Sequence, residues 1–193
     1  MSYNNKYRTK SLRLPYQDYR DNGGYFVTIC TQNRLCFFGD IKDNKVQLSS
    51  TGKIAQQFWA DLPQHFNYVS LDAFIIMPNH VHGIIIINQS AQNFTTDDYG
   101  EVTCNVSTND VENLSQTMSQ LSPKAGSLSV IIRSYKAAVT RWCKQNSDQN
   151  FSWQPRFYEH IIRNQNSLDR IREYIINNPL RWHEDKNNPV NIS

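Results

Sequence analysis

No run of apolar residues in this sequence approaches the about 18 to 20 residues that a membrane-spanning helix needs. The apolar run at residues 84–87 has the size of a buried strand segment. The first ten residues, MSYNNKYRTK, lack the apolar core of a secretory signal. The sequence therefore predicts a cytoplasmic protein with no membrane partner.

Cysteine is scarce, and a P-loop is missing. None of the four cysteines belongs to a CxxC pair, which zinc ribbons and redox motifs require. We expect free thiols, with a structural zinc or a disulfide as the less favoured alternative, at Cys30, Cys36, Cys104 and Cys143. The sequence contains no GxxxxGK[S/T] motif, so it offers no P-loop for ATP binding.

The formal net charge is only +3, but the charges are unevenly distributed. Five Lys or Arg and one acid lie in the first twenty residues, whereas residues 89–125 hold five acids and one base. Without that acidic stretch the rest of the chain carries +7. A basic folded part suits a polyphosphate partner, although a solvated surface explains the same balance equally well.

The 193 residues fit one domain, 1–193, with a polar insertion at about 88–125. The insertion is rich in Asn, Gln, Ser and Thr and has no hydrophobic periodicity. Such a segment cannot bury enough apolar surface to offset its ordering, so we expect it to be mobile and dispensable for the fold. Strand-like segments precede the insertion, and helical patterns follow it.

The first strand-like segments predict a hairpin. Residues 25–31 and 35–41 are rich in β-branched and aromatic side chains and are separated by a polar break. A second turn at Asp43–Asn44 leads into the strand KVQLS. The next segment has apolar residues at every fourth position, which predicts a helix capped by Ser50 or Thr51.

Two apolar runs, 71–78 and 80–87, follow that helix. Two-residue hairpin turns of the usual types need positive φ, which Pro78 does not adopt. We therefore expect one long strand with an irregularity at Pro78, or two closely joined strands, rather than a two-residue hairpin.

The part after the insertion reads as helical. Ser127 precedes a long amphipathic pattern, which predicts a helix that begins there. Residues 151–163 look extended. A last helix is expected from Ser167, as its cap, to Pro179, which ends it.

The strongest chemical signal is the sequence PNHVHG. Side chains at i and i+2 of a strand share one face, so His80 and His82 project together while Val81 points into the core. Two imidazoles on one face can bind one divalent ion, and an oxygen ligand beside them would suit Mg²⁺ or Mn²⁺. Two solvated surface histidines are the alternative interpretation.

Three of the ten tyrosines are candidate nucleophiles. Tyr135 lies in the apolar stripe of its helix, which favours a core position. Tyr158 shares a strand face with His160. Tyr174 lies beside the stripe of the last helix, one turn before Asn178, so that a hydroxyl and an amide oxygen share one helix face. A partly buried aromatic followed by a helix-capping Asn is the alternative, and the pattern of this helix alone favours it.

Five stretches together resemble the REP-associated tyrosine transposases, within the HUH single-tyrosine transposase superfamily: GYFVTICTQNR, MPNHVHGII, SLSVIIRSYK, WQPRFYEHIIRN and YIINNPLRW. The resemblance runs from about Lys10 to Trp182, apart from the insertion at 88–125. Five motifs in one order are far more specific than a pair of histidines.

The resemblance implies an α+β fold, with a ferredoxin-like or RRM-like antiparallel sheet and helices packed on it. It implies that His80 and His82 bind a divalent metal, Mg²⁺ or Mn²⁺, and that Asn178 supplies a third ligand. It implies Tyr174 as the nucleophile that cleaves single-stranded DNA and forms a 5′-phosphotyrosine. Related enzymes act as monomers in cis or as homodimers in trans.

The expected partner is single-stranded or hairpin DNA of the REP type. Basic side chains outside the insertion are the candidate phosphate contacts: Arg8, Lys10, Arg13, Arg133, Lys136, Arg156 and Arg163. Two other functions stay open. One is a non-catalytic nucleic-acid-binding module with Tyr25, Phe37 and Phe38 as stacking residues, and the other is an HUH replication-initiator-type nickase.

Overall fold

A computed structural model describes residues 22–89, 126–146 and 150–191. The N-terminal arm with Arg8, Lys10 and Arg13 lies outside these residues, as do Cys104 and nearly all of the insertion predicted at 88–125. Within the described part, Cys30, Cys36 and Cys143 are free thiols, as predicted. No helix of that part is long and apolar enough to cross a membrane.

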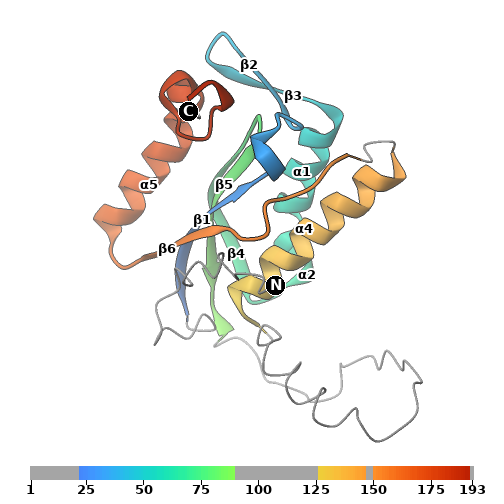
Figure 1. The fold of residues 1–193 in the computed structure, drawn as a ribbon. Helices are drawn as coiled ribbons and strands as arrows, with labels where there is room; N and C mark the ends of the chain where they lie inside the picture. The colour runs from blue at the N-terminus through green and yellow to red at the C-terminus, as the bar shows by residue number, and fades with distance from the viewer. Residues whose placement is uncertain (1–21, 90–125, 147–149, 192–193) are drawn as a thin grey trace, which may run out of the picture.

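A four-stranded antiparallel sheet forms the centre of the molecule (Figure 1). Its strands, in the order β4-β5-β1-β6, are β4 (Val69–Met77), β5 (His80–Ile87), β1 (Gly23–Cys30) and β6 (Tyr158–Ile162). In chain order these strands are the second, third, first and fourth of the sheet, which is the ferredoxin-like arrangement. The predicted α+β fold class is confirmed.

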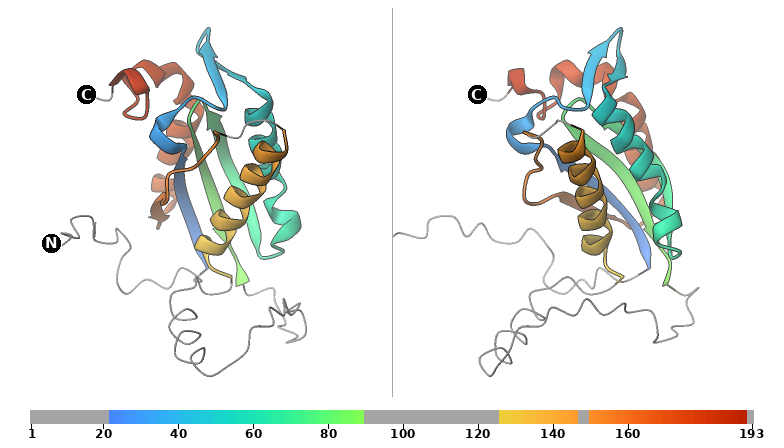
Figure 2. Two further views of the ribbon diagram at one scale, coloured as in Figure 1. Left: turned by 45° about the vertical axis from the view of Figure 1, so that its right-hand side comes forward. Right: turned by 90° about the vertical axis from the view of Figure 1, so that its right-hand side faces the viewer.

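Helices cover both faces of this sheet (Figure 2). Helix α1 (Ser50–Ala60) and helix α4 (Leu128–Gln145) pack on one face, and α5 (Gln165–Asn177) packs on the other. The remaining elements are short: α2 (Leu62–His65), the β2–β3 hairpin (Gly39–Lys42 and Lys45–Leu48), and the 3-10 helices η1 (Gln32–Arg34), η3 (Pro179–Glu184) and η4 (Pro189–Asn191).

Strand alternation divides the apolar residues between two cores. On β1, Tyr25, Val27 and Ile29 point toward α1 and α4 and belong to the large core cluster. Phe26 points the other way and forms a smaller core with Ile84 of β5 and the apolar stripe of α5. The smaller core therefore fixes α5 on the face of β5 that carries the even-numbered residues, including the two histidines.

The predicted hairpin between residues 25–31 and 35–41 is wrong. Both edges of β1 are occupied, one by β5 and one by β6, so no edge is left for the segment that follows it. The later residues pair instead across the turn at Asp43–Asn44 as the β2–β3 hairpin. Asp43 and Asn44 both adopt positive φ, 50° and 58°, as a two-residue turn of this kind requires.

Of the two expectations at Pro78, two closely joined strands are confirmed, but the exclusion of a two-residue hairpin is wrong. Met77 pairs directly with His80, so Pro78 and Asn79 form a two-residue connection between antiparallel strands, and neither has positive φ. Contacts from other segments hold this turn: Phe38 N donates to the Pro78 carbonyl (2.9 Å), and Thr31 N donates to the Asn79 carbonyl (2.9 Å). Long-range hydrogen bonds stabilise a turn that local propensity disfavours.

Two predicted helix caps are displaced toward the N-terminus. Ser49, rather than Ser50 or Thr51, caps α1, and its Oγ accepts a hydrogen bond from Gly52 N at 3.0 Å. Asn164, rather than Ser167, caps α5 and accepts from Ser167 N at 2.9 Å. In each helix the capping side chain reaches the amide three residues ahead. Helix α4 begins where the sequence predicts, after Ser127.

Candidate active site

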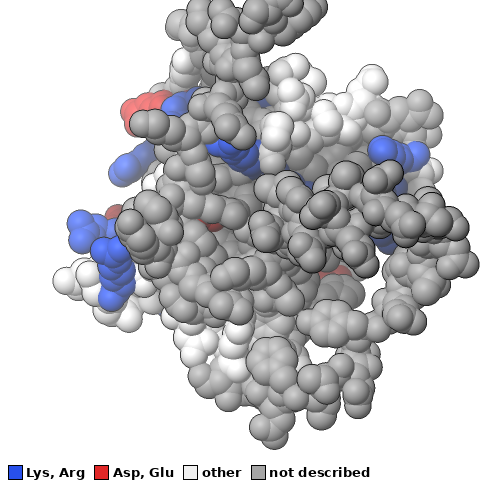
Figure 3. All heavy atoms as spheres, turned by 60° about the horizontal axis from the view of Figure 1, so that its bottom comes forward, with Lys and Arg blue, Asp and Glu red and all other residues white. Residues whose placement is uncertain are grey.

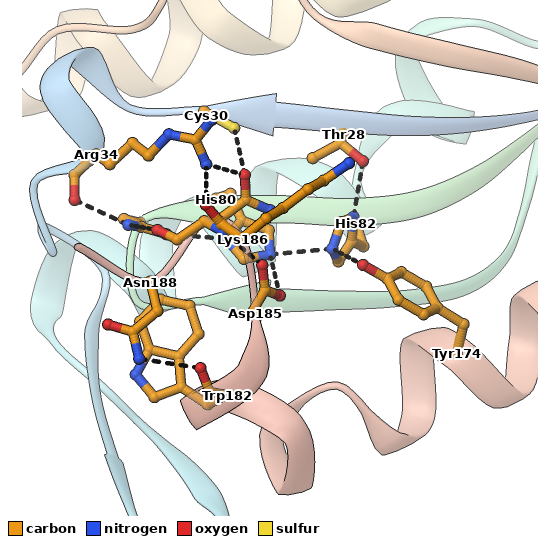
Figure 4. A network of polar contacts seen from close by, with 12 residues as sticks. Thr28, Cys30, Arg34, His80, His82, Tyr174, Trp182, Asp185, Lys186 and Asn188 are labelled. Atoms are coloured by element: carbon orange, nitrogen blue, oxygen red, sulfur yellow. Dashed lines mark hydrogen bonds and ion pairs between the residues drawn. The ribbon is translucent and has the colours of Figure 1, made fainter. Parts of the chain in front are cut away.

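The two predicted histidine ligands lie on one face of β5. His80 and His82 are 0% and 1% exposed, and their Nε2 atoms are 3.0 Å apart (Figure 4). Both rings point toward the α5 side of the sheet, so the common face predicted from their i, i+2 spacing is confirmed. The short separation places two nitrogen atoms within reach of one ion.

Asn79 fixes the orientation of the His80 ring. Its amide nitrogen donates to the carbonyls of Arg34 and Asn187, both at 2.8 Å, so its Oδ1 is the atom that faces His80 Nδ1 at 2.8 Å. Because Oδ1 can only accept, Nδ1 of His80 carries the proton and Nε2 presents a lone pair. This is the arrangement of a metal-binding histidine held by an outer hydrogen-bond partner.

Thr28 plays the corresponding part for His82. Its Oγ1 lies 2.8 Å from His82 Nδ1, and when it accepts the proton of Nδ1, the Nε2 of His82 also presents a lone pair. Two such lone pairs 3.0 Å apart repel one another unless a proton or a cation lies between them. Nitrogen ligands about 2.1 Å from one ion, at roughly a right angle, would show this same separation.

Burial keeps both imidazoles neutral. Burial first, and then the positive charges of Arg34 and Lys186, lowers the pKa of His80 to about 3. The pKa of His82 also lies well below its usual range, because of burial and then because of His80. Neutral imidazole is the form that binds a metal, so the pair needs no deprotonation at neutral pH.

Asp185 completes a group that the sequence did not reveal. It follows η3, and its Oδ2 lies 3.8 Å from His80 Nε2. The candidate ligand atoms of His80, His82 and Asp185 all lie within 4.8 Å of one another. Oδ2 of Asp185 is buried and has no hydrogen-bond partner in the described part of the chain, which is costly unless a cation neutralises it. The donor set therefore fits a divalent ion.

Asn178, the predicted third ligand, ends α5. Its side chain is 3% exposed, and its Oδ1 also lacks a hydrogen-bond partner among the described residues. A buried amide oxygen without a partner is consistent with a ligand, so the structure offers two candidate oxygen donors. Of the two, Asp185 has its carboxylate oxygen 3.8 Å from His80 Nε2. The role of Asn178 as a ligand stays a prediction.

Tyr174 lies against the histidine pair of its own chain. Its hydroxyl oxygen is 3.3 Å from His82 Nε2, and the two ring centroids are 5.1 Å apart. Burial, and then the negative charge of Asp185, raises the pKa of the hydroxyl, while the Asn178 side chain acts in the opposite direction. The tyrosine nevertheless remains 40% exposed, so a substrate can reach it from solvent.

The other two candidate tyrosines lie elsewhere. Tyr135 is buried between α4 and α1, and its hydroxyl donates to the Ala55 carbonyl at 3.1 Å, as the predicted core position requires. Tyr158 is 51% exposed on β6 and contacts Phe26 edge-on. Tyr174 is thus the only one of the three whose hydroxyl is hydrogen-bonded to a candidate ligand.

Comparisons with known proteins identify a relative of this chain. No family model matches the chain. An uncharacterized protein of Haemophilus influenzae (strain ATCC 51907 / DSM 11121 / KW20 / Rd) is 39% identical over 179 residues, which is 92% of this chain and 91% of that protein. This chain belongs to the same family.

A solved structure shares the fold of this chain. A REP-associated tyrosine transposase, solved bound to a REP hairpin, superimposes with a TM-score of 0.54 at 20% identity. The match covers 90% of this chain and 77% of the transposase. It supports the ferredoxin-like arrangement described above.

The predicted phosphate contacts that the structure describes lie on different elements of the protein. Arg133 is exposed on α4, in the layer opposite the histidines, and Arg163 is exposed just after β6. Lys136 donates to the carbonyls of Gln154 (2.7 Å) and Arg156 (3.1 Å), so its ammonium is engaged internally. Figure 3 shows Lys and Arg side chains among the described residues on both sides of this face. Their contact with DNA stays a prediction.

The stacking residues of the alternative binding function are mostly inaccessible. Tyr25 is 1% exposed and Phe38 is 0% exposed, because both belong to the large core. Only Phe37 is partly accessible. These side chains therefore do not form the aromatic surface that a sheet-based RNA-binding module uses.

Proposed function

We propose that this protein is a metal-dependent HUH single-tyrosine transposase or endonuclease, which cleaves and rejoins single-stranded DNA at hairpin, REP-like sequences. The observation that carries this proposal is the hydrogen bond of 3.3 Å between the Tyr174 hydroxyl and His82 of the same chain, beside the buried His80–His82–Asp185 group. We assign the activity to one domain, residues 1–193, that includes the polar insertion at about 88–125.

The metal would be Mg²⁺ or Mn²⁺. His80, His82 and Asp185 would hold it, with Asn178 as a further oxygen donor. When bound, the ion would polarise the phosphodiester and stabilise the charge that develops on its oxygens. Two neutral imidazoles with one carboxylate form a mixed nitrogen and oxygen donor set, which transition metals such as Mn²⁺ bind more tightly than Mg²⁺.

Tyr174 supplies the covalent step. Its hydroxyl oxygen attacks the phosphorus, an O–P bond forms, and the bond from phosphorus to the 3′ oxygen breaks. The leaving strand then ends in a 3′-OH, and the other strand is joined to Tyr174 through its 5′ phosphate. Attack by a 3′-OH on this linkage reverses the step and restores the hydroxyl, so no ATP is consumed.

The proton of Tyr174 must leave during this attack. Because burial and Asp185 raise its pKa, the hydroxyl is protonated at neutral pH. In the structure this hydroxyl faces Nε2 of His82, and the exposed side of the ring is open to water. A water molecule on that side is the proton acceptor that we expect when His82 is engaged as a ligand.

The same-chain contact supports action in cis. Tyr174 reaches His82 from α5 of its own chain, and Phe26 and Ile84 pack against Ile175 of that helix. A monomer can therefore present both the nucleophile and the candidate ligands. A dimer with the tyrosine in trans would require α5 to leave this smaller core.

A covalent-adduct assay tests the proposal. A single-stranded hairpin oligonucleotide labelled at its 3′ end is incubated with Mn²⁺, because the labelled strand is the one that stays joined to the protein. The wild-type chain and Tyr158→Phe should give a labelled band on a denaturing gel. Tyr174→Phe should give none, because it lacks the nucleophilic oxygen but keeps the ring.

Three outcomes would contradict parts of this proposal. An adduct that forms in Tyr174→Phe and disappears in Tyr158→Phe would reassign the nucleophile. The absence of an adduct on every REP-like hairpin with either metal, while DNA still binds, would favour a non-catalytic binding module. A preference for replication-origin sequences over REP-like hairpins would favour an HUH initiator-type nickase.

A further inference from the structure

We propose that Tyr158 and Lys186 form a stacking subsite for a nucleobase of single-stranded DNA, next to the phosphate that Tyr174 attacks. This inference rests on the proposed function for its ligand. It concerns residues that the cleavage step does not use, and it explains why an aromatic side chain is exposed so close to the candidate active site.

The strand register places Tyr158 in line with the site. Thr28 of β1 pairs with His82 of β5 on one side and with Tyr158 of β6 on the other. The three residues therefore form one row across the sheet, on the face that α5 covers. Neighbouring strands are about 4.8 Å apart, so the backbones of His82 and Tyr158, two strands apart, are separated by about 10 Å.

Phe26 connects the two tyrosines beneath this row. Its ring stacks on His82 with centroids 5.4 Å apart. It also contacts Tyr174 edge-on at 6.0 Å and Tyr158 edge-on at 6.3 Å. Because one phenyl ring contacts both tyrosines, a nucleotide that adjoins the attacked phosphate can reach Tyr158.

Exposure and charge indicate the kind of ligand. Tyr158 is 51% exposed on the edge strand of the sheet, although a single exposed aromatic residue is not unusual by itself. Here Lys186, the neighbour of Asp185, places its Nζ 5.9 Å from the centroid of this ring. A half-exposed aromatic ring with a lysine nitrogen over it combines a stacking surface with attraction to a phosphate, which is how proteins bind single strands without reading sequence.

A binding assay separates this subsite from catalysis. The full-length chain with Tyr174→Phe serves as the parent, so that no cleavage occurs, and the probe is fluorescein-labelled (dT)10 in a fluorescence-anisotropy titration. Adding Tyr158→Ala should weaken binding by about ten- to hundredfold, because one base–aromatic stack is lost. Tyr158→Phe keeps the stacking face and should remain within about threefold of the parent. Ile176→Ala, which truncates a side chain 68% exposed on α5, is the matched control and should bind like the parent.

Abasic substitution locates the stacked base without altering the protein. Each thymine of (dT)10 is removed in turn, and one position should lose affinity with the parent protein but not with Tyr158→Ala. Lys186→Gln should make the slope of log affinity against log salt shallower by about 0.7, the value for one phosphate contact on a single strand. Together these arms test the base and the phosphate separately.

Several results would overturn the subsite. Binding by Tyr158→Ala as tight as the parent would do so, as would a Tyr158→Phe variant as weak as Tyr158→Ala, or an abasic scan with no sensitive position. If wild-type protein forms no covalent adduct but these binding effects are observed, the proposed enzymatic activity is contradicted and the subsite is supported. A parent that does not bind (dT)10 would reject both.

Discussion

Asn79 is the residue on which the geometry of the candidate site depends most directly. It is fully buried, and its side chain joins three segments: the 3-10 turn at Arg34, the C-terminal segment at Asn187, and His80 itself. It is not itself a proposed metal ligand. Its amide holds two carbonyls and one imidazole in fixed positions, and those positions decide which nitrogen of His80 is free.

Removing this amide should damage the metal site without removing a ligand. Asn79→Ala leaves the carbonyls of Arg34 and Asn187 without a donor and His80 without its outer partner. We expect the affinity for Mn²⁺ to fall by about 10- to 100-fold, the usual effect of losing such a partner. Isothermal titration calorimetry measures it, with exposed Asn166→Ala as the control. Unchanged affinity in Asn79→Ala would show that His80 is not oriented in this way.

The identity of the oxygen ligand is a second question at this scale. Asp185→Asn removes the negative charge and keeps the shape, so it should reduce Mn²⁺ affinity by at least about tenfold, whereas Asn178→Ala should have the smaller effect. The same calorimetric titration compares the two variants. A large loss in Asn178→Ala with none in Asp185→Asn would return the third ligand to the residue predicted from the sequence.

Strand β5 depends on a glycine because a tryptophan packs against its backbone. A Cβ at Gly83 would lie 2.3 Å from Cζ2 of Trp59, whose ring is fully buried. Gly83→Ala should lower the free energy of unfolding by about 1–3 kcal/mol, because the core must move to admit the methyl group. Urea denaturation checks this value. Gly24→Ala is the control, since its Cβ would meet Ile162 at an ordinary 3.5 Å.

A β-bulge in β4 joins the sheet to α5, the helix that carries the proposed nucleophile. The register shifts between Leu71 and Phe74, and Asp72 at this bulge accepts two hydrogen bonds from Arg172 of α5, at 2.8 Å and 2.6 Å. This ion pair, which lowers the pKa of Asp72, spans from β4 to a residue two positions before Tyr174. It therefore fixes the rotation and height of α5 over the histidines.

Breaking this pair should misplace the nucleophile more than it unfolds the protein. Arg172→Asp and Asp72→Arg should each slow adduct formation by on the order of tenfold or more, because small displacements of a reacting group are costly. The double variant, which restores opposite charges, should recover part of the rate. Single-turnover rates measure the effect, and affinity for DNA should stay within about twofold in all three variants. Equal rates in wild type and both single variants would show that α5 is held by its apolar stripe alone.

The elements that the sequence predicts well are those specified by local patterns. Apolar periodicity identifies α4 and α5, and the i, i+2 spacing places His80 and His82 on one face. Asp185 was missed because it belongs to no periodic segment, and its position depends on Asn187 and Arg34, which are remote from the histidines in sequence. The prediction for the pairing of β1 was wrong for the same reason, because long-range packing determines which strands lie beside β1.

At the scale of the whole molecule, the buried neutral histidines make metal-free stability depend on pH. The folded pKa of His80 is about 3, whereas an unfolded histidine titrates near about 6.5. Between these values the unfolded chain binds more protons, so the free energy of unfolding should fall as the pH decreases below about 6.5. Above that range His80 contributes no slope.

Urea denaturation of EDTA-treated protein at several pH values between about 5 and 8 checks this expectation. His80→Gln combined with His82→Gln removes both titrating groups, so the slope below about 6.5 should become shallower in this variant. An identical slope in the wild type and in the double variant would show that other groups control the acid sensitivity.

The proposed nucleophile lies far after the histidines in the chain, which has a consequence for when the protein becomes able to cleave DNA. Tyr174 lies 92 residues after His82, and Asn187 lies 108 residues after Asn79, which it contacts. Ribosomes add about 5–20 residues per second, so the central strands are synthesised several seconds before α5 and Asp185. A nascent or prematurely terminated chain that has made β5 but not α5 carries the histidines without the tyrosine. Under the proposed function, such a chain cannot cut single-stranded DNA, and only a chain that also contains α5 and Asp185 acquires that ability.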